Sequence, residues 1–298
     1  MNTIYSHGKL LLTSEYAVLK SAKALAVPCK MGQSLMYTPS EDGKLYWQSF
    51  DTKKCIWFEA VFTIHSLELI SSSDAEVAYR LQTLLKTSKK MNPTFLTQGG
   101  EVKCHLEFDR SWGLGSSSTL VANIAQWAET NPYELLAHSF GGSGYDIACA
   151  LAQSPITYRR NQNNPKIEAV ELSYPFEDNL FFVHLNKKRN SQEAVAAFDL
   201  EKVDQSYIDS LSQLTDQIIS CSEQTRFNDY LKTHERLVGE LLHQTSVQDM
   251  FFPDFKGAIK SLGAWGGDFV WVSGTRQSPE YFRQKGYKTI LSFREMLL

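Results

Sequence analysis

A run of glycine and hydroxyl residues, Gly113–Thr119, separates a predicted strand from a predicted apolar helix. Gly113 and Gly115 allow the backbone to approach a ligand closely, and the free N–H groups in the first turn of a helix attract an anion. The serine hydroxyls at 116–118 add hydrogen-bond donors or oxygen ligands for Mg²⁺. The pattern therefore indicates an anion site, with a serine-capped helix N-terminus as the plain alternative. It is not a Walker A loop, because no Lys-Ser or Lys-Thr pair closes it.

A second glycine cluster ends beside a single carboxylate. Asp146 is the one charged residue of the segment FGGSGYDIA, residues 140–148, and an apolar helix is predicted to follow it. A carboxylate in this place can accept a proton from a substrate hydroxyl, or it can cap the helix. A hydrolase elbow of the form GxSxG is excluded, because its last glycine would fall on Tyr145.

Two further segments carry charged residues beside glycines or apolar runs. Residues 260–268, KSLGAWGGD, precede the strand-like FVWVS and predict a tight turn into a strand. Residues 6–19, SHGKLLLTSEYAVL, contain Lys9 and Glu15. A lone lysine or glutamate in such a segment is usually solvated or part of an ion pair.

The composition is that of a globular chain and excludes several classes of protein. There are 298 residues with 30 basic and 33 acidic side chains, so the net charge of −3 gives no footprint for nucleic acid. No apolar run approaches the roughly 18 residues of a membrane span, and the N-terminus has no signal-peptide pattern. The five cysteines form no CxxC pair, which fits a reduced cytoplasm. We therefore expect a cytoplasmic protein without a membrane or nucleic-acid partner.

The elements that must position these residues follow from periodicity. Alternating or β-rich segments predict strands, and helical spacing predicts three amphipathic helices to which we assign no chemistry. The strands are predicted at 44–50, 55–62, 101–108, 179–185 and 268–272, and the helices at 77–85, 208–218 and 227–242. A boundary is expected near residues 152–166, where Asn, Pro, Arg and Lys gather without a period. This order predicts two α+β halves.

Taken in order, the four segments resemble the motifs of the GHMP kinases, the superfamily of galactokinase, homoserine kinase, mevalonate kinase and phosphomevalonate kinase. Residues 6–19 are similar to PGKLLLxGEYAVL, and GLGSSST at 113–119 resembles the phosphate loop GLGSSAA. SGYD at 143–146 resembles the SGxD segment with the catalytic aspartate, and KSLGAWGGD resembles a worn KxTGAGGGG. The resemblance spans nearly the whole chain, within the mevalonate and phosphomevalonate kinase-like branch.

The resemblance implies an α+β, two-domain GHMP kinase-like fold with ATP and acceptor between the domains. The N-terminal domain, residues 1–158, would be ribosomal-protein-S5-like and would bind nucleotide, and the C-terminal domain, residues 159–298, would be ferredoxin-like. The residues implied to hold the ATP phosphates are Gly113, Leu114, Gly115, Ser116, Ser117 and Ser118.

The resemblance also implies the catalytic and metal-binding residues. Asp146 matches the catalytic aspartate, and Lys9 matches the lysine that pairs with it. Ser117 matches a Mg²⁺ contact, and Glu134 is the nearest candidate for the second metal ligand. A lysine beside an aspartate keeps the carboxylate ionised and lowers the pKa of the attacking hydroxyl.

Departures from the family pattern concern mainly nucleotide binding. Ser14 replaces the glycine of GEY, and Leu262 replaces the hydroxyl residue of the third motif. Trp265 and Asp268 interrupt its glycine run, where an indole and a carboxylate would hinder close approach of a phosphate. The third motif would then keep only a packing role, or the nucleotide would sit differently.

The acceptor implied by the resemblance is mevalonate or phosphomevalonate, because SEYAVL at 14–19 is closer to the phosphomevalonate kinase GEYAVL than to GEHAVV. The basic loop at 186–191 would suit an acceptor carboxylate or phosphate, and a solvated turn is equally compatible. Acceptor contacts are expected from Glu15, Ser143, Gly144, Lys188 and Ser191. The alternatives are a homoserine or sugar kinase, the related ATP-dependent decarboxylase, or a non-catalytic nucleotide-binding relative. A homodimer is among the assemblies that the sequence allows.

Overall fold

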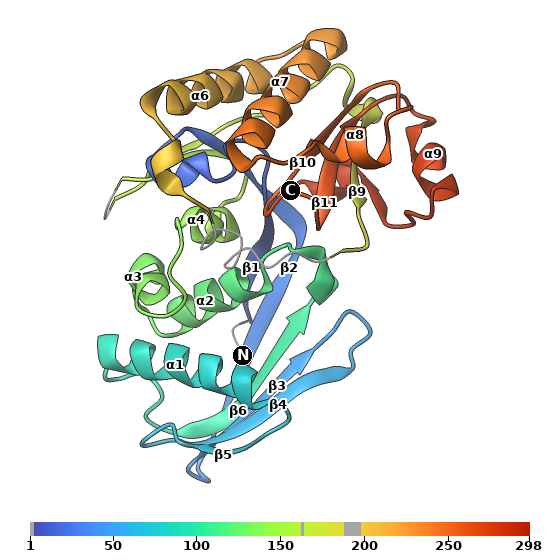
Figure 1. Cartoon of the computed structure of the whole chain (residues 1–298). Coiled ribbons are helices and arrows are strands. Elements are labelled where there is room, and N and C mark those ends of the chain that lie inside the picture. The colour runs from blue at the N-terminus through green and yellow to red at the C-terminus, as the bar shows by residue number, and fades with distance from the viewer. Residues whose placement is uncertain (1–2, 162–163, 188–197) are drawn as a thin grey trace. The chain divides into compact units, whose positions relative to one another are not determined.

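The computed structural model describes residues 3–161, 164–187 and 198–298, and Figure 1 shows its elements along the chain. The chain divides into two compact units. The first unit contains residues 1–8, 31–110 and 114–151, and the second contains residues 9–30, 111–113 and 152–298. The strands β1 (Thr3–Leu11) and β2 (Ala24–Ser40) each run from one unit into the other.

The first unit is built on a sheet in the order β5-β4-β3-β6-β2. The pair β3 and β6 is parallel, with Trp47 opposite Val102, and the other neighbours pair antiparallel. In β3, β4 and β6 the buried positions recur with the period of two that puts alternate residues on one face. Their bounds are Lys44–Phe50 for β3, Ile56–Thr63 for β4, Leu69–Ser72 for β5 and Gly99–Leu106 for β6.

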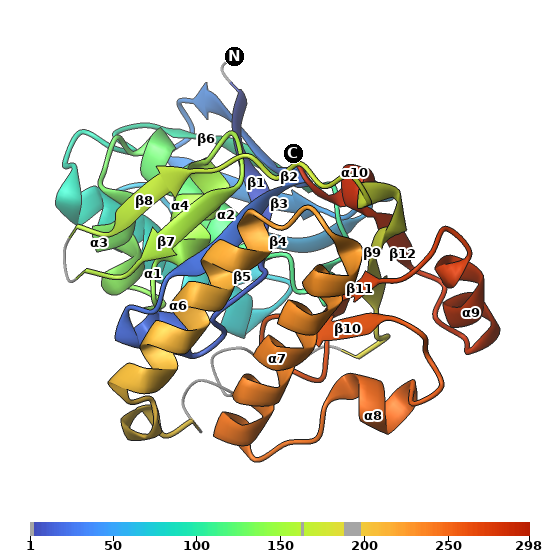
Figure 2. The same ribbon diagram turned by 90° about the horizontal axis from the view of Figure 1, so that it is seen from above.

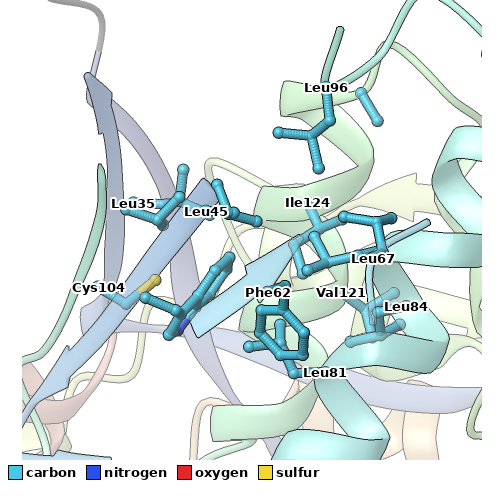
Figure 3. Close-up of a cluster of buried hydrophobic side chains, with 14 of the residues drawn as sticks. Leu35, Leu45, Phe62, Leu67, Leu81, Leu84, Leu96, Cys104, Val121 and Ile124 are labelled. Atoms are coloured by element: carbon cyan, nitrogen blue, oxygen red, sulfur yellow. The ribbon is translucent and has the colours of Figure 1, made fainter. Parts of the chain in front are cut away.

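Helices cover one face of this sheet, as Figure 1 shows. They are α1 (Ala75–Met91), α2 (Ser116–Trp127), α3 (Pro132–Ala137) and α4 (Tyr145–Leu151). Helix α1 begins where the Asp74 carboxylate accepts hydrogen bonds from Glu76 N and Val77 N. Figure 3 shows the core between helices and sheet, where Leu81 and Leu84 of α1 pack near Phe62 of β4. This core fixes α2, and with it the N-terminus that follows the glycine turn.

The second unit contains an antiparallel sheet in the order β10-β11-β9-β12. Strands β7 and β8 pair with each other, and β7 also pairs with the first residues of β2. Helices α6 and α7 run alongside each other, and Figure 2 shows them with the strand β10. The strand bounds are Ile156–Arg159 (β7), Lys166–Ala169 (β8), Leu180–His184 (β9), Ala258–Ser261 (β10), Phe269–Ser273 (β11) and Ile290–Ser292 (β12). The helix bounds are Gln205–Ile219 (α6), Gln224–Leu242 (α7), Val247–Phe251 (α8), Ser278–Gln284 (α9) and Phe293–Met296 (α10).

Short 3-10 helices complete the described chain: η1 (Ala17–Lys20), η2 (Arg110–Trp112), η3 (Glu177–Asn179) and η4 (Leu200–Lys202). None of the five cysteines, all of which lie in the described part of the chain, forms a disulfide. Among the helices of the described chain, none combines the length and apolar character that crossing a bilayer requires.

The α+β class and every strand and helix predicted from periodicity are confirmed, within one to three residues at most ends. The 17-residue strand β2 was not predicted. Its first part, residues 24–29, is buried on both faces and therefore shows no alternation, and Pro28 within it argues against a strand. The boundary expected near residues 152–166 agrees with the start of the last segment of the second unit at residue 152. A single boundary there would assign residues 9–30 and 111–113 to the first unit, whereas they belong to the second.

Candidate functional site

The N-terminus of α2 carries no side-chain cap. Its N-cap is Gly115, which adopts a φ of +87°, and the first turn contains no acidic residue. Gly113, two residues earlier, also has a positive φ of +68°. Glycine is the residue that reaches this region without steric cost. The first N–H groups of a helix have no partner within it, so this turn presents donors and the positive end of a helix dipole to an anion.

Of the hydroxyl residues that follow, two are buried and form hydrogen bonds within the protein, and two are at least partly exposed. The Ser118 hydroxyl donates to Gly115 O over 2.9 Å, and the buried Thr119 hydroxyl donates to Gln33 Oε1 over 2.7 Å. Ser117 is exposed and Ser116 is half-buried. The second serine after the glycines is therefore the most exposed of the three, and its contact with a metal ion stays a prediction.

The side chains around this turn suit a metal ion that is held mainly by the oxygens of a bound molecule and of water, with few protein ligands. Among the described residues, no three His, Cys, Asp or Glu side chains gather closely enough to hold a metal ion. Mg²⁺ commonly takes only one or two protein ligands and completes its shell with water and phosphate oxygens. An exposed hydroxyl such as that of Ser117 fits this mode, whereas a preformed protein cage for the metal is not found in the described chain.

Asp146 lies in the first turn of α4, directly after a glycine-rich turn. Gly141, Gly142 and Gly144 all have positive φ, and the Asp146 side chain is half-buried. A carboxylate in the first turn of a helix is stabilised by the helix dipole. Burial and the negative charge of Asp146 raise the pKa of Tyr133 to about 12, so the two side chains lie within electrostatic range of each other. Asp146 is thus held on a helix of the first unit with access to solvent.

The other predicted residues near Asp146 have different exposures. Ser143 is half-buried and Gly144 is buried in the turn before α4. Glu134 is exposed on α3, directly after Tyr133. Because successive residues of a helix face different directions, the proximity of Tyr133 to Asp146 does not extend to Glu134. The metal-ligand role of Glu134 stays a prediction.

Lys9 and Asp268 both meet Gly113 within the second unit. The Lys9 Nζ donates to Gly113 O over 3.2 Å from the end of β1. The Asp268 carboxylate lies against the Cα of Gly113, because a Cβ built there would be 2.5 Å from Asp268 Cγ and Oδ2. The first glycine of the predicted phosphate loop therefore has a cation at its carbonyl and an anion at its Cα.

The third motif is packed into the second unit. Leu262 and Trp265 are each 1% exposed, and Trp265 belongs to the hydrophobic cluster that includes Tyr16 and Leu211. Lys260, at the start of the motif, is fully buried. These residues fill the interior, which agrees with the packing alternative of the sequence reasoning.

Glu15 is the partner of Lys260. The Lys260 Nζ lies 2.5 Å from Glu15 Oε1, and both side chains are fully buried. Before it, Ser14 adopts a φ of +63°, the left-handed conformation that glycine adopts freely and that explains the glycine in the family motif. The structure thus places Glu15 in an internal ion pair. Lys188 and Ser191, predicted near the acceptor, lie outside the described residues.

Sequence reasoning missed two buried polar residues on α7. His234 Nε2 accepts from Ser14 N over 2.8 Å, and Glu235 accepts from the N–H and the hydroxyl of Ser261. Burial lowers the pKa of His234 well below its usual value, and burial raises that of Glu235 to about 7. The signal was available in the sequence, because 234 and 235 fall at helical spacing from the core positions Leu231 and Val238.

Comparisons with solved structures identify the fold. The chain matches mevalonate kinase of Methanococcus jannaschii with a TM-score of 0.71 and 13% identity, over 97% of this chain and 96% of that one. It matches Streptococcus pneumoniae phosphomevalonate kinase, solved with phosphomevalonate and AMPPNP, with a TM-score of 0.71 and 14% identity, over 98% and 100%. The fold is that of the GHMP kinases.

A sugar kinase is also among the matched structures. Lactococcus lactis galactokinase, solved with galactose, matches with a TM-score of 0.66 and 14% identity, over 99% of this chain and 93% of that one. No protein-family model matches the sequence, and no curated protein is significantly similar to it. The likeness therefore lies in the three-dimensional arrangement of the GHMP kinase fold, over almost the full length of each chain.

Proposed function

We propose that this chain is an ATP-dependent small-molecule kinase, which transfers the γ-phosphoryl group of ATP to an alcohol or phosphate acceptor. The observation that carries the proposal is the uncapped N-terminus of α2, preceded by glycines with positive φ and bearing the exposed Ser117. Its support is the GHMP kinase fold, in which a matched structure holds both AMPPNP and phosphomevalonate. The reaction is proposed to take place in the cytoplasm.

In this proposal the backbone of the loop binds the nucleotide. The N–H groups of residues 113–118 donate to phosphate oxygens, and Leu114, whose side chain is fully buried, anchors the loop in the core. Ser117 and Glu134 are the proposed protein ligands of Mg²⁺. When bound, Mg²⁺ neutralises charge on the transferring phosphoryl group. The protein contributes chiefly position and fixed dipoles.

Asp146 is the proposed acceptor of the proton from the acceptor hydroxyl. A free hydroxyl attacks poorly, and a carboxylate placed to take its proton commonly contributes about 10²–10⁴ in rate. The helix dipole at the start of α4 favours the ionised form of Asp146 that this role needs. Lys9 is proposed as the cation that favours the same ionised form and lowers the pKa of the hydroxyl.

Replacement of Asp146 by asparagine tests the catalytic assignment. We expect Asp146→Asn to reduce phosphoryl transfer by at least about 10²-fold, because the amide cannot accept the proton, while nucleotide affinity stays within about threefold. The measurement is coupled ADP release, with nucleotide binding followed by calorimetry. Asp74→Asn is the matched control, since asparagine caps α1 as well as aspartate does. Near-normal turnover of Asp146→Asn would remove this residue from the mechanism.

The acceptor is proposed to be mevalonate or phosphomevalonate. The support is the SEYAVL segment and the matches to mevalonate and phosphomevalonate kinases. A panel of mevalonate, phosphomevalonate, homoserine and galactose, assayed for ADP release, separates the acceptors. Turnover only with homoserine or galactose rejects the isoprenoid acceptor but keeps the kinase. Release of CO₂ from a diphosphorylated mevalonate would instead identify a decarboxylase, and nucleotide binding without turnover would identify a non-catalytic relative.

A further inference from the structure

The carboxylate of Asp268 is packed onto the first glycine of the proposed phosphate loop. A Cβ built on Gly113 would lie 2.5 Å from Cγ and Oδ2 of Asp268, and 2.9 Å from Oδ1. Heavy atoms do not approach a real Cβ this closely, so only glycine can occupy position 113 while Asp268 keeps its place. The contact lies within the second unit. It brings a negative charge to the chain directly before the anion-binding turn.

Backbone hydrogen bonds hold Asp268 at this position. Its N–H donates to Lys187 O over 2.7 Å, and its carbonyl accepts from Leu185 N over 2.7 Å. The residue has a φ of +51° and is 7% exposed. Asp268 immediately precedes β11, so the strand and these two bonds fix the position of its backbone.

The segment before the loop is fastened to the same strands. His184 Nε2 of β9 lies 3.2 Å from Ser111 O, and the rings of Trp112 and Phe269 pack edge to face at 5.7 Å. Residues 111–113 therefore belong with β9 and β11, and these contacts keep the backbone of Gly113 beside the start of β11.

The distance along the chain brings this charge within range of bound phosphates. Gly113 is three residues from Ser116, which is at most about 11 Å of extended chain. This upper limit exceeds the Debye length of about 8 Å at physiological ionic strength, but screening is much weaker for a buried charge such as that of Asp268. A fixed carboxylate here repels an uncomplexed triphosphate and tolerates one whose charge a divalent cation has partly neutralised.

We propose that Asp268 makes nucleotide binding by this chain depend on a divalent cation. The inference rests on the proposed function, because it assumes that ATP binds at the glycine turn. Lys9, at the carbonyl of the same glycine, remains when Asp268 is neutralised, so removal of the carboxylate makes the local potential more positive. Metal-free ATP should then bind more tightly, whereas the complex of ATP with Mg²⁺ should gain little.

The test compares ATP binding with Mg²⁺ and with EDTA at constant ionic strength, by isothermal titration calorimetry of the full chain. We expect Asp268→Asn to tighten metal-free ATP by about tenfold and to change the affinity for Mg²⁺-ATP by less than threefold. Asp268→Gly is the second variant, because glycine adopts a φ of +51° without strain and should fold even if the amide disturbs the packing. Both variants should reduce the ratio of the two dissociation constants.

Asp254→Asn is the matched control, because it changes the net charge equally at an exposed ion pair with Lys285. It should leave both dissociation constants as in the unaltered chain. Equal metal-free affinity in the unaltered chain and in both Asp268 variants overturns the inference, and so does an equal tightening in Asp254→Asn. If the unaltered chain binds neither form of ATP, the proposed function fails as well, so the two failures are distinguishable.

Discussion

Ser117 differs from its neighbours because it is exposed, whereas Thr119 is buried and its hydroxyl donates to Gln33 Oε1. We expect Ser117→Ala to leave the free energy of unfolding within about 0.5 kcal/mol. It should weaken Mg²⁺-nucleotide binding by about tenfold, the cost of one lost bond to a charged ligand. Nucleotide titrations at several Mg²⁺ concentrations and urea unfolding measure the two effects.

Thr119→Val is the matched control for this prediction. It removes a hydroxyl two residues away but keeps the branched shape, and it leaves Gln33 Oε1 without that donor. Loss of a buried hydrogen bond should cost about 1–3 kcal/mol of stability. An unchanged Mg²⁺ dependence in Ser117→Ala would count against the role of that residue in metal binding.

The buried carboxyl of Glu235 should make stability depend on pH. Burial raises its pKa from 4.5 to about 7, against the opposing charge of Lys260. The folded state therefore favours the protonated form, and this contribution is fully present below pH 4.5. It is lost as the pH rises towards and through 7. A raised pKa of this size corresponds to about 3 kcal/mol.

We expect Glu235→Gln to remove this part of the pH dependence, because the amide cannot ionise but can still bond Ser261. Relative to the original chain, the variant should gain about 3 kcal/mol between pH 4.5 and pH 8, measured by urea unfolding at each pH. Glu240→Gln, on the same helix but half exposed, is the control and should keep the original pH dependence. Parallel stability curves for the Glu235 variant and the original chain would contradict the prediction.

At the level of single residues, motif order marks the residues proposed for the site, whereas the buried polar residues are marked only by packing. Asp146 was proposed because glycines precede it in the sequence, and the structure places it in the first turn of a helix. Glu15 was expected at the acceptor, but its carboxylate is buried against Lys260, 245 positions away in the sequence. Such a pair leaves no local pattern, because its partners meet only when the chain has folded.

Among the elements, the glycine turn before α2 depends on its packing against the start of β11. Gly113 and Gly141 have nearly the same φ, +68° and +65°, but a Cβ at Gly141 would meet nothing within 4 Å. We expect Gly141→Ala to cost about 1 kcal/mol for the left-handed conformation alone. Gly113→Ala should cost about 1–3 kcal/mol more, because its methyl group overlaps the Asp268 carboxylate.

A double variant isolates that overlap. Asp268→Gly removes the obstructing carboxylate, so Gly113→Ala should cost no more in this background than Gly141→Ala costs in the original chain. Urea unfolding of the four proteins gives the coupling energy. If the two changes are additive, the methyl group of Ala at position 113 does not overlap the Asp268 carboxylate, and the explanation is wrong.

The elements themselves were largely predictable where one face is buried. The strict alternation of residues 101–108 predicted β6, which the structure places at Gly99–Leu106. The strand β2 escaped prediction because its first residues are buried on both faces and include Pro28. Periodicity reports burial on one side of an element, and it is silent where both sides are covered.

For the molecule as a whole, net charge does not explain anion binding. With 30 basic and 33 acidic side chains the chain has no general attraction for phosphates. Any affinity for a nucleotide must come from helix ends, a metal ion and single lysines. The fold could be predicted from four short motifs in order, although the matched kinases share only 13–14% identity with the chain. The acceptor cannot be predicted from the fold, because the matched mevalonate kinase, phosphomevalonate kinase and galactokinase share one fold but are named for different acceptors.

The shared strands should make the two units unfold together. Residues 24–26 of β2 pair with β7 in the second unit, and residues 33–40 pair with β6 in the first. Unfolding of either unit therefore removes the hydrogen-bonding partners of one part of β2. We expect one calorimetric transition for the full chain. Mg²⁺-AMPPNP at 100 times its dissociation constant should stabilise the chain by about 2.7 kcal/mol and raise the whole transition by about 4 °C for 298 residues. The Ser117→Ala chain, at the same ligand concentration, should show a smaller rise. Two transitions, of which the nucleotide shifts only one, would mean that the units fold independently and that β2 does not couple them.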